Sequence, residues 1–197
     1  MTKVEKLRER FKNHIATLTQ HGDLQVLTWR KKGTSIYSIR FVFDGSCMYI
    51  SGDMGDAVFS WQSVTELHSF KKMDLGYFAE KISTMSMGKY IFDEKVAMEK
   101  FENWLEYNLA PDDIDEAQEQ SLQEFKNEIE SIYSLEEWRM YVHDASELFE
   151  EFMCDWSEHK YTLYDFGKEL HPNIQAYLVG LQMAAEQLSE KEVHNGR

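Results

Sequence analysis

Cysteine, proline and long apolar runs are scarce in this sequence. Its 197 residues include two cysteines and two prolines. Cys47 and Cys154 form neither a disulfide framework nor a CxxC pair, so both are expected to be reduced. No apolar run approaches the roughly 18 residues of a membrane span, and the charged start MTKVEKLRERFK has no signal-peptide core. These absences predict a cytoplasmic protein.

The composition is that of a folded chain rather than a disordered one. Hydrophobic residues make up 43% and aromatic residues 14%, although the net charge is −14. No internal repeat or proline-rich linker is visible. We therefore expect one compact α+β unit.

The charge is distributed unevenly along the chain. Residues 1–100 contain 15 Lys/Arg and 12 Asp/Glu, whereas residues 101–197 contain 6 and 23. Residues 101–160 alone carry a net −15, and residues 1–40 a net +6. Blocks of one sign indicate either an interaction surface or a solvated helix face.

The N-terminal half has a helix pattern followed by strand patterns. Thr2 to Glu5 is a capping box, and apolar residues at helical spacing predict one helix over Val4, Leu7, Phe11, Ile15 and Leu18. An antiparallel sheet of three or four strands is expected at 24–30, 35–43, 46–51 and 57–62. Asp44-Gly45 is a two-residue hairpin signal, and 52–56 is a longer loop.

The C-terminal half has the 3.6-residue period of helices. Helix starts are predicted at residue 75 (a short helix over 75–84), after Asp93, at Pro111, at the capping box Ser134 to Glu137, and after His171-Pro172. The helix from Ser134 is expected to run to about Trp156. The predicted helical core includes Trp104, Phe125, Trp138 and Phe149. The expected organisation is a helix plus sheet over 1–92 and an acidic helical subdomain over 93–197.

No pattern for catalysis, metal binding or a cofactor stands out. The loop Gly52 to Asp56 precedes a strand rather than a helix, so it fits a hairpin better than a phosphate loop. Cys154, Asp155, Glu158 and His159 have no paired spacing typical of zinc, and Cys154 fits a core position. The seven histidines form no HxH, HxxxH or HExxH motif, and His14 fits a core or boundary position. We predict no catalytic residue, metal or cofactor.

A basic turn, Arg30-Lys31-Lys32, follows Trp29. Cations beside an aromatic ring can hold a nucleic-acid backbone and stack a base. The alternative is a solvated turn that pairs with the acidic half. Arg30, Lys31 and Lys32 are therefore candidate nucleic-acid contacts.

Three segments carry a resemblance to a known group of proteins: FDGSCMYISGDMGDAVFSW (43–61), LGYFAEKI (75–82) and HPNIQAYLVGLQMAAEQL (171–188). They are similar to small phage and prophage proteins with an ISGDxGxAVFxW-like hairpin. The matching residues are turn glycines, strand aromatics and helix stripes. Some small acidic proteins of mobile elements are anti-CRISPR inhibitors of type II, Cas9-type effectors. The resemblance thus implies an inhibitor that acts in the cytosol of a host bacterium, without assigning that activity to any residue.

The leading hypothesis is a phage or mobile-element protein that inhibits a host nucleic-acid-targeting defence enzyme, such as Cas9 or its guide-RNA complex. It would bind through an acidic surface that enters a basic groove of that enzyme. Its candidate contacts are Glu116, Glu119, Glu124, Glu128, Glu130, Glu136, Glu137, Glu147, Glu150 and Glu151. One alternative is a metal-dependent nucleic-acid-processing enzyme that uses acids such as Asp53 and Asp56. Another is a phage structural or regulatory module that forms homo-oligomers.

Overall fold

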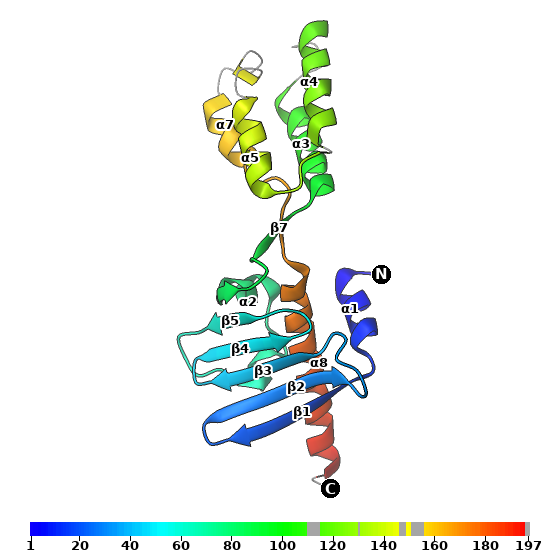
Figure 1. Cartoon of the computed structure of the whole chain (residues 1–197), viewed down its shortest axis with the longest axis vertical. Helices are drawn as coiled ribbons and strands as arrows, with labels where there is room; N and C mark the ends of the chain where they lie inside the picture. The colour runs from blue at the N-terminus through cyan, green and yellow to red at the C-terminus, as the bar shows by residue number, and fades with distance from the viewer. Residues whose placement is uncertain (110–114, 130, 146–148, 151–155, 196–197) are drawn as a thin grey trace. The chain divides into compact units, whose positions relative to one another are not determined.

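The computed structural model describes residues 1–109, 115–129, 131–145, 149–150 and 156–195. The chain divides into two compact units: unit 1 is Met1–Lys89 with Leu170–Arg197, and unit 2 is Tyr90–Glu169 (Figure 1). Unit 2 is thus an insertion in the sequence of unit 1. The α+β class is confirmed. No helix in the described ranges has the length and apolar character needed to cross a bilayer.

Unit 1 contains a six-stranded antiparallel meander, larger than the expected three or four strands. Its strands lie side by side in chain order: β1 (His14–His21), β2 (Leu24–Lys31), β3 (Ile39–Asp44), β4 (Cys47–Gly52), β5 (Ala57–Ser60) and β6 (Ile82–Met85). Asp44 pairs with Cys47, so the tight turn consists of Gly45 and Ser46 rather than Asp44-Gly45. Gly45 has φ 57°, which a residue without a Cβ adopts readily.

The prediction of a helix through Leu18 was wrong. Helix α1 (Lys3–Phe11) begins with the predicted Thr2 capping box but ends at Phe11, and the next segment is strand β1. All eight residues of β1 pair with β2. Ladder pairing and β-branched residues outweigh the helical spacing of Ile15 and Leu18.

Two other boundaries differ from the prediction. The second predicted strand begins at Ile39 instead of Ser35, because Tyr37 turns the chain with φ 57°. The predicted helix 75–84 splits into α2 (Leu75–Glu80) and β6, which pairs with β5.

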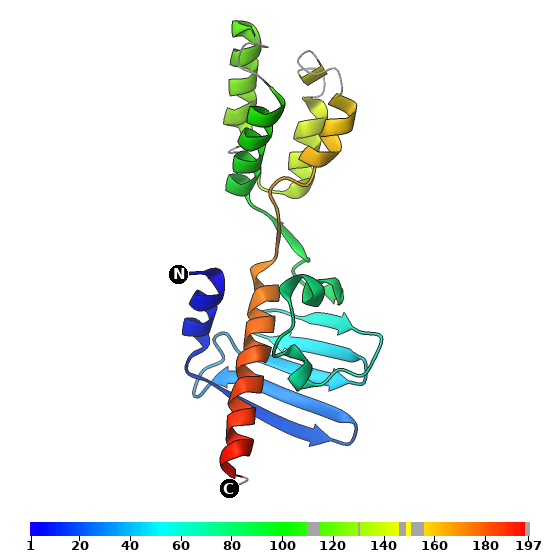
Figure 2. The same cartoon turned by 180° about the vertical axis from the view of Figure 1, so that it is seen from behind.

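One face of the sheet is covered by α8 (Pro172–Asn195), which crosses it in Figure 2. Helices α1, α2 and η1 (Leu67–Phe70) pack against α8. The buried strand residues on this face include Leu27, Trp29, Ile39, Phe41, Phe43, Met48, Ile50 and Phe59. A Cβ on Gly180 would lie 3.2 Å from Cδ1 of Trp29, so glycine allows α8 to approach the sheet closely. Although residues 93–197 were expected to form one subdomain, α8 therefore packs in unit 1.

Unit 2 is helical around a second core. It contains β7 (Tyr90–Phe92), α3 (Glu94–Asn108), α4 (Glu116–Ile129), α5 (Leu135–Asp144), α7 (Trp156–Leu163) and the first two residues of β8 (Lys168–Leu170), and β7 pairs with β8. The predicted caps at Asp93 and Ser134 are present. Trp104, Phe125, Trp138 and Phe149 are all buried, as predicted. Pro111 lies outside the described residues, and α5 ends at Asp144 rather than running on to Trp156.

Candidate functional site

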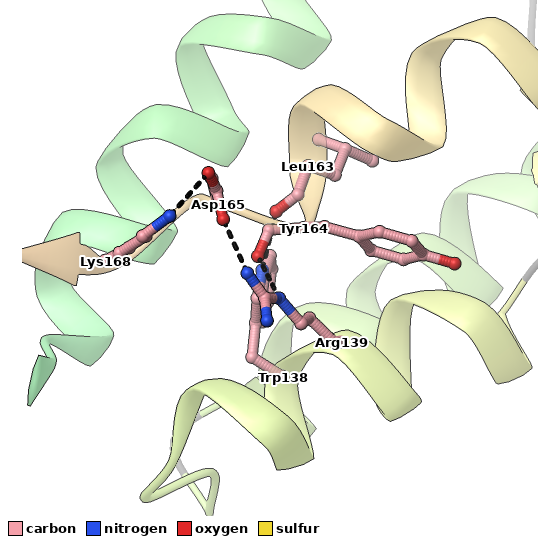
Figure 3. Close-up of polar contacts among 6 residues, drawn as sticks. All are labelled: Trp138, Arg139, Leu163, Tyr164, Asp165 and Lys168. Atoms are coloured by element: carbon pink, nitrogen blue, oxygen red, sulfur yellow. Dashed lines mark hydrogen bonds and ion pairs between the residues drawn. The ribbon is translucent and has the colours of Figure 1, made fainter. Parts of the chain in front are cut away.

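The C-terminal end of α7 is attached to α5 by a group of polar contacts (Figure 3). The Trp138 indole Nε1 donates to the Leu163 carbonyl oxygen at 2.6 Å, and Arg139 Nε donates to the Tyr164 carbonyl oxygen at 3.2 Å. Helix C-terminal carbonyls lack intrahelical donors, so these side chains satisfy them. Asp165 accepts hydrogen bonds from Lys168 and Arg139, which lower the pKa of its carboxyl group.

These contacts use two of the few cations in unit 2. Residues 90–169 contain 23 Asp/Glu and 6 Lys/Arg, a net charge of −17. Unit 1 contains 12 Asp/Glu and 15 Lys/Arg, a net charge of +3. Because Arg139 and Lys168 pair with Asp165, and Lys100 lies 3.8 Å from Glu169, half of these cations already face a carboxylate within the unit.

Seven of the ten predicted contact glutamates lie in the described part of the chain, and all seven are exposed: Glu116, Glu119, Glu124, Glu128, Glu136, Glu137 and Glu150. Glu130, Glu147 and Glu151 lie outside the residues whose side chains are described. The apolar positions of α4, Leu122, Phe125 and Ile129, are buried. The helix therefore separates an apolar face from an acidic one, as its sequence predicts.

Two of these glutamates also stabilise the unit itself. Glu137 accepts from the backbone N–H groups of Tyr133 and Ser134 in the capping box. Burial, with a hydrogen bond to Glu128, raises the pKa of the Tyr141 hydroxyl. A substitution of Glu128 or Glu137 would therefore change the stability of the unit as well as its binding surface, and a binding assay would not separate the two effects.

An acidic groove of about 560 Å³ is formed by α3 and the end of α4. Its lining consists of Glu94, Lys95, Met98, Glu99, Glu102 and Ile129. The half-buried Met98 gives the groove its apolar surface, and Ile129, which is 1% exposed, lies beneath it. Glu99 and Glu102 are exposed. Such a groove can hold the aliphatic stem of a Lys or Arg side chain while the carboxylates face its charged end.

The sequence did not predict this groove, because the apolar spacing in α3 indicates only its buried positions. Glu94, Met98 and Glu102 are separated by four residues each, so they lie along one helix face. That spacing was a usable signal for the α3 side. The contribution of Ile129 from α4 was not visible in the sequence.

The predicted basic turn is split by the alternation of the strand. Arg30 and Lys32 line a groove on the face of the sheet away from α8, together with Ile15 and Thr17. Lys31 is paired with His14 and therefore lies on the opposite face. The three cations thus do not form one cluster.

The other sequence candidates have structural contacts. Gly52 to Asp56 connects β4 to β5, and Asp53 Oδ2 accepts from the Tyr37 N–H at 2.7 Å. His14 is buried, and its Nε2 lies 3.1 Å from the Tyr37 carbonyl oxygen. Cys154 lies outside the described residues. Among the residues that the structure describes, no group of three or more His, Cys, Asp or Glu is placed to hold a metal ion.

Comparisons with protein-family models, with curated proteins and with solved structures found no match to this chain. The resemblance to small phage proteins therefore remains a prediction. Inferences about function depend on the geometry and charge of the two units.

Proposed function

We propose that this protein is a binding protein whose acidic helical unit occupies a Lys/Arg-lined, nucleic-acid-binding groove of another protein. The observation that supports this most directly is the acidic groove between α3 and α4, in a unit of net charge −17. A partner cation entering it meets three carboxylates, those of Glu94, Glu99 and Glu102, against one lining cation, Lys95.

Several helices together supply the acidic surface. Helix α4 is about 21 Å long and carries four glutamates and one lysine, so its acidic groups are spaced about 5 Å apart on average. Duplex DNA has one negative charge about every 1.7 Å of its axis. With its lysine counted, α4 has one net negative charge per about 7 Å and therefore reaches about a quarter of that density. The glutamates of α3 are needed to compete with nucleic acid.

The partner class follows from this chemistry. A groove that binds nucleic acid presents Lys and Arg side chains at high density. The net negative charge of unit 2 accelerates its association with such a groove. The resemblance to phage proteins favours a host defence enzyme, and a Cas9-type effector with its guide RNA is the specific proposal.

The first test measures binding to a basic probe, a fluorescently labelled nona-arginine peptide, by anisotropy. The groove variant Glu99→Lys/Glu102→Lys changes two exposed residues and leaves Ile129 in place. An exposed ion pair contributes about 0.2–1 kcal/mol, and reversal adds repulsion, so affinity should fall about tenfold. The matched control, Glu66→Lys/Glu80→Lys, makes the same charge change at exposed positions of unit 1.

The second test measures DNA cleavage by a Cas9–guide RNA complex with increasing amounts of this protein. Inhibition by the wild type and the control variant, with loss in the groove variant, supports the proposal. Equal binding of nona-arginine by the wild type and the groove variant would show that the acidic groove is only a solvated surface. Unaffected cleavage with intact, groove-dependent peptide binding would exclude this effector and direct the search to another basic partner.

A further inference from the structure

The face of the sheet opposite α8 carries a row of exposed and half-buried side chains across the central strands. Val26 pairs with Val42, Val42 with Tyr49, and Tyr49 with Val58. Tyr49 is 44% exposed. We call this row, together with Thr28 and Arg40 in the adjacent row, the open face. No helix in the described part of unit 1 crosses it (Figure 1).

A basic groove of about 530 Å³ lies at one end of the open face. Its cations are Arg30 and Lys32, and the rest of its lining is Ile15, Thr17, Gly33, Thr34, Ser35 and Ser38. No carboxylate is among these residues. The groove therefore combines two cationic side chains with four hydroxyl groups, which are the donors that phosphate groups accept from.

The cations of this groove differ from three cations at and just after α1, which have partners. Arg8 is paired with Glu186, Lys12 with Glu9, and Arg10 lies over the Tyr37 ring. Within the described ranges, no ion pair or side-chain hydrogen bond involves Arg30, Lys32 or Arg40. Their charge is thus not neutralised by a neighbouring carboxylate in this unit.

The groove and Tyr49 lie along one track. Arg30 and Tyr49 are two strands apart in the sheet and are offset by four residues along it, which separates their backbones by about 17 Å. Arg40 lies between them, since Thr28 pairs with Arg40 and Arg40 with Ser51.

We propose that the open face and basic groove bind single-stranded nucleic acid. Arg30 and Lys32 contact phosphates in the groove, Arg40 contacts the backbone along the track, and a base stacks on Tyr49. An open sheet face with an exposed aromatic ring and flanking cations is a stacking platform that needs no particular base sequence. An acidic protein segment would use the cations but has no need of the exposed Tyr49 ring, so nucleic acid fits the whole surface better. This site lies in unit 1 and does not depend on the function proposed for unit 2.

The experiment titrates the full chain into labelled oligo(U) and oligo(dT) 12-mers at several salt concentrations and follows anisotropy. Arg30→Glu/Lys32→Glu should abolish measurable binding. The milder Arg30→Gln/Lys32→Gln variant should reduce the slope of log affinity against log salt by about 1.4, which corresponds to two phosphate contacts on a single strand. Tyr49→Ala should weaken binding about tenfold with an unchanged salt slope, since stacking carries no charge.

The matched control is Lys3→Glu/Lys72→Glu, which makes the same charge change at exposed positions of unit 1 outside the open face. It should bind the 12-mers like the wild type, and thermal melts should show that every variant is folded. A 12-residue polyglutamate peptide identifies the other class of ligand. If it binds as tightly as the 12-mers, the surface is an acidic-peptide site and the proposal is wrong. Absence of 12-mer binding by the folded wild type, or equal loss in the control, would also overturn it.

Because the variants of this test leave Glu99 and Glu102 unchanged, nona-arginine binding reports on unit 2 separately. Loss of 12-mer binding with retained nona-arginine binding assigns the nucleic-acid site to the sheet. Failure of the nona-arginine test alone would refute only the function proposed for the acidic groove.

Discussion

Substitution of Trp138 separates packing from hydrogen bonding in the core of unit 2. Its side chain is fully buried, and its ring packs against Phe92 at 6.1 Å between centroids, with Phe101 and Phe125 also within 6.5 Å. Its Nε1 donates to the Leu163 carbonyl oxygen, which also accepts from the Phe166 N–H at 2.9 Å. Trp138→Ala removes the ring and the donor, whereas Trp138→Phe keeps an aromatic ring and removes the donor.

The two variants should differ clearly in stability. Trp138→Ala should lower the free energy of unfolding by about 3–5 kcal/mol, the typical cost of deleting a buried aromatic side chain. Trp138→Phe should lower it by about 1–2 kcal/mol, because the Leu163 carbonyl keeps one donor. The 80 residues of unit 2 are expected to have a stability of about 4–12 kcal/mol, so Trp138→Ala removes a large share of it.

Hydrogen exchange followed by mass spectrometry measures this change within one unit. Peptides from α3 and α5 should exchange about 5- to 30-fold faster in Trp138→Phe and more than a hundredfold faster in Trp138→Ala, since 1.4 kcal/mol corresponds to about tenfold. Peptides over residues 39–60 of unit 1 serve as the internal reference. Equal acceleration by both variants would show that the ring contributes nothing beyond its hydrogen bond, and unchanged exchange would refute its place in the core.

Two further predictions concern unit 1. Gly52→Ala should lower the free energy of unfolding by more than about 2 kcal/mol, because Gly52 has φ 136° and a Cβ there would lie 2.4 Å from the Ser38 carbonyl oxygen. A urea titration measures this change, and an unchanged midpoint would show that the backbone relaxes to accept the Cβ. Burial lowers the pKa of His14 below its ordinary value of 6.5, so the unfolded chain takes up this proton first as the pH falls. Stability is therefore complete above about pH 6.5 and declines below it, and urea midpoints at about pH 7.5 and 5.5 should differ less in His14→Gln than in the wild type. Burial also lowers the pKa of His171, so part of the decline should persist, and an identical decline in both proteins would contradict the role of His14.

Local features were predictable where neighbouring residues decide the structure. The capping residues Thr2, Asp93 and Ser134 each satisfy backbone N–H groups of their own helix, and these helices begin where the sequence indicates. The exposure of the glutamates on α4 also follows from its helical period, since the same period buries Leu122, Phe125 and Ile129.

Features that require pairing with another strand were not predictable. Ile15 and Leu18 continue the apolar spacing of α1, but pairing of β1 with β2 makes that segment a strand. Ile82 to Met85 follows a helix pattern in the sequence, and it becomes β6 because the edge of β5 is available to it.

The two surfaces proposed for binding show the same division. Residue types alone indicated an acidic helical region and a basic turn, because charge composition is a property of the sequence. Only the tertiary structure brought Ile129 of α4 beside Glu99 of α3, and only strand pairing separated Arg30 from Lys31. Helix α8 covers the sheet after an insertion of 80 residues, and that choice of partner depends on burying both apolar surfaces together. The sequence by itself thus determined the helix caps, the buried helix faces and the distribution of charge, whereas packing and strand pairing determined β1, β6 and which elements share a surface.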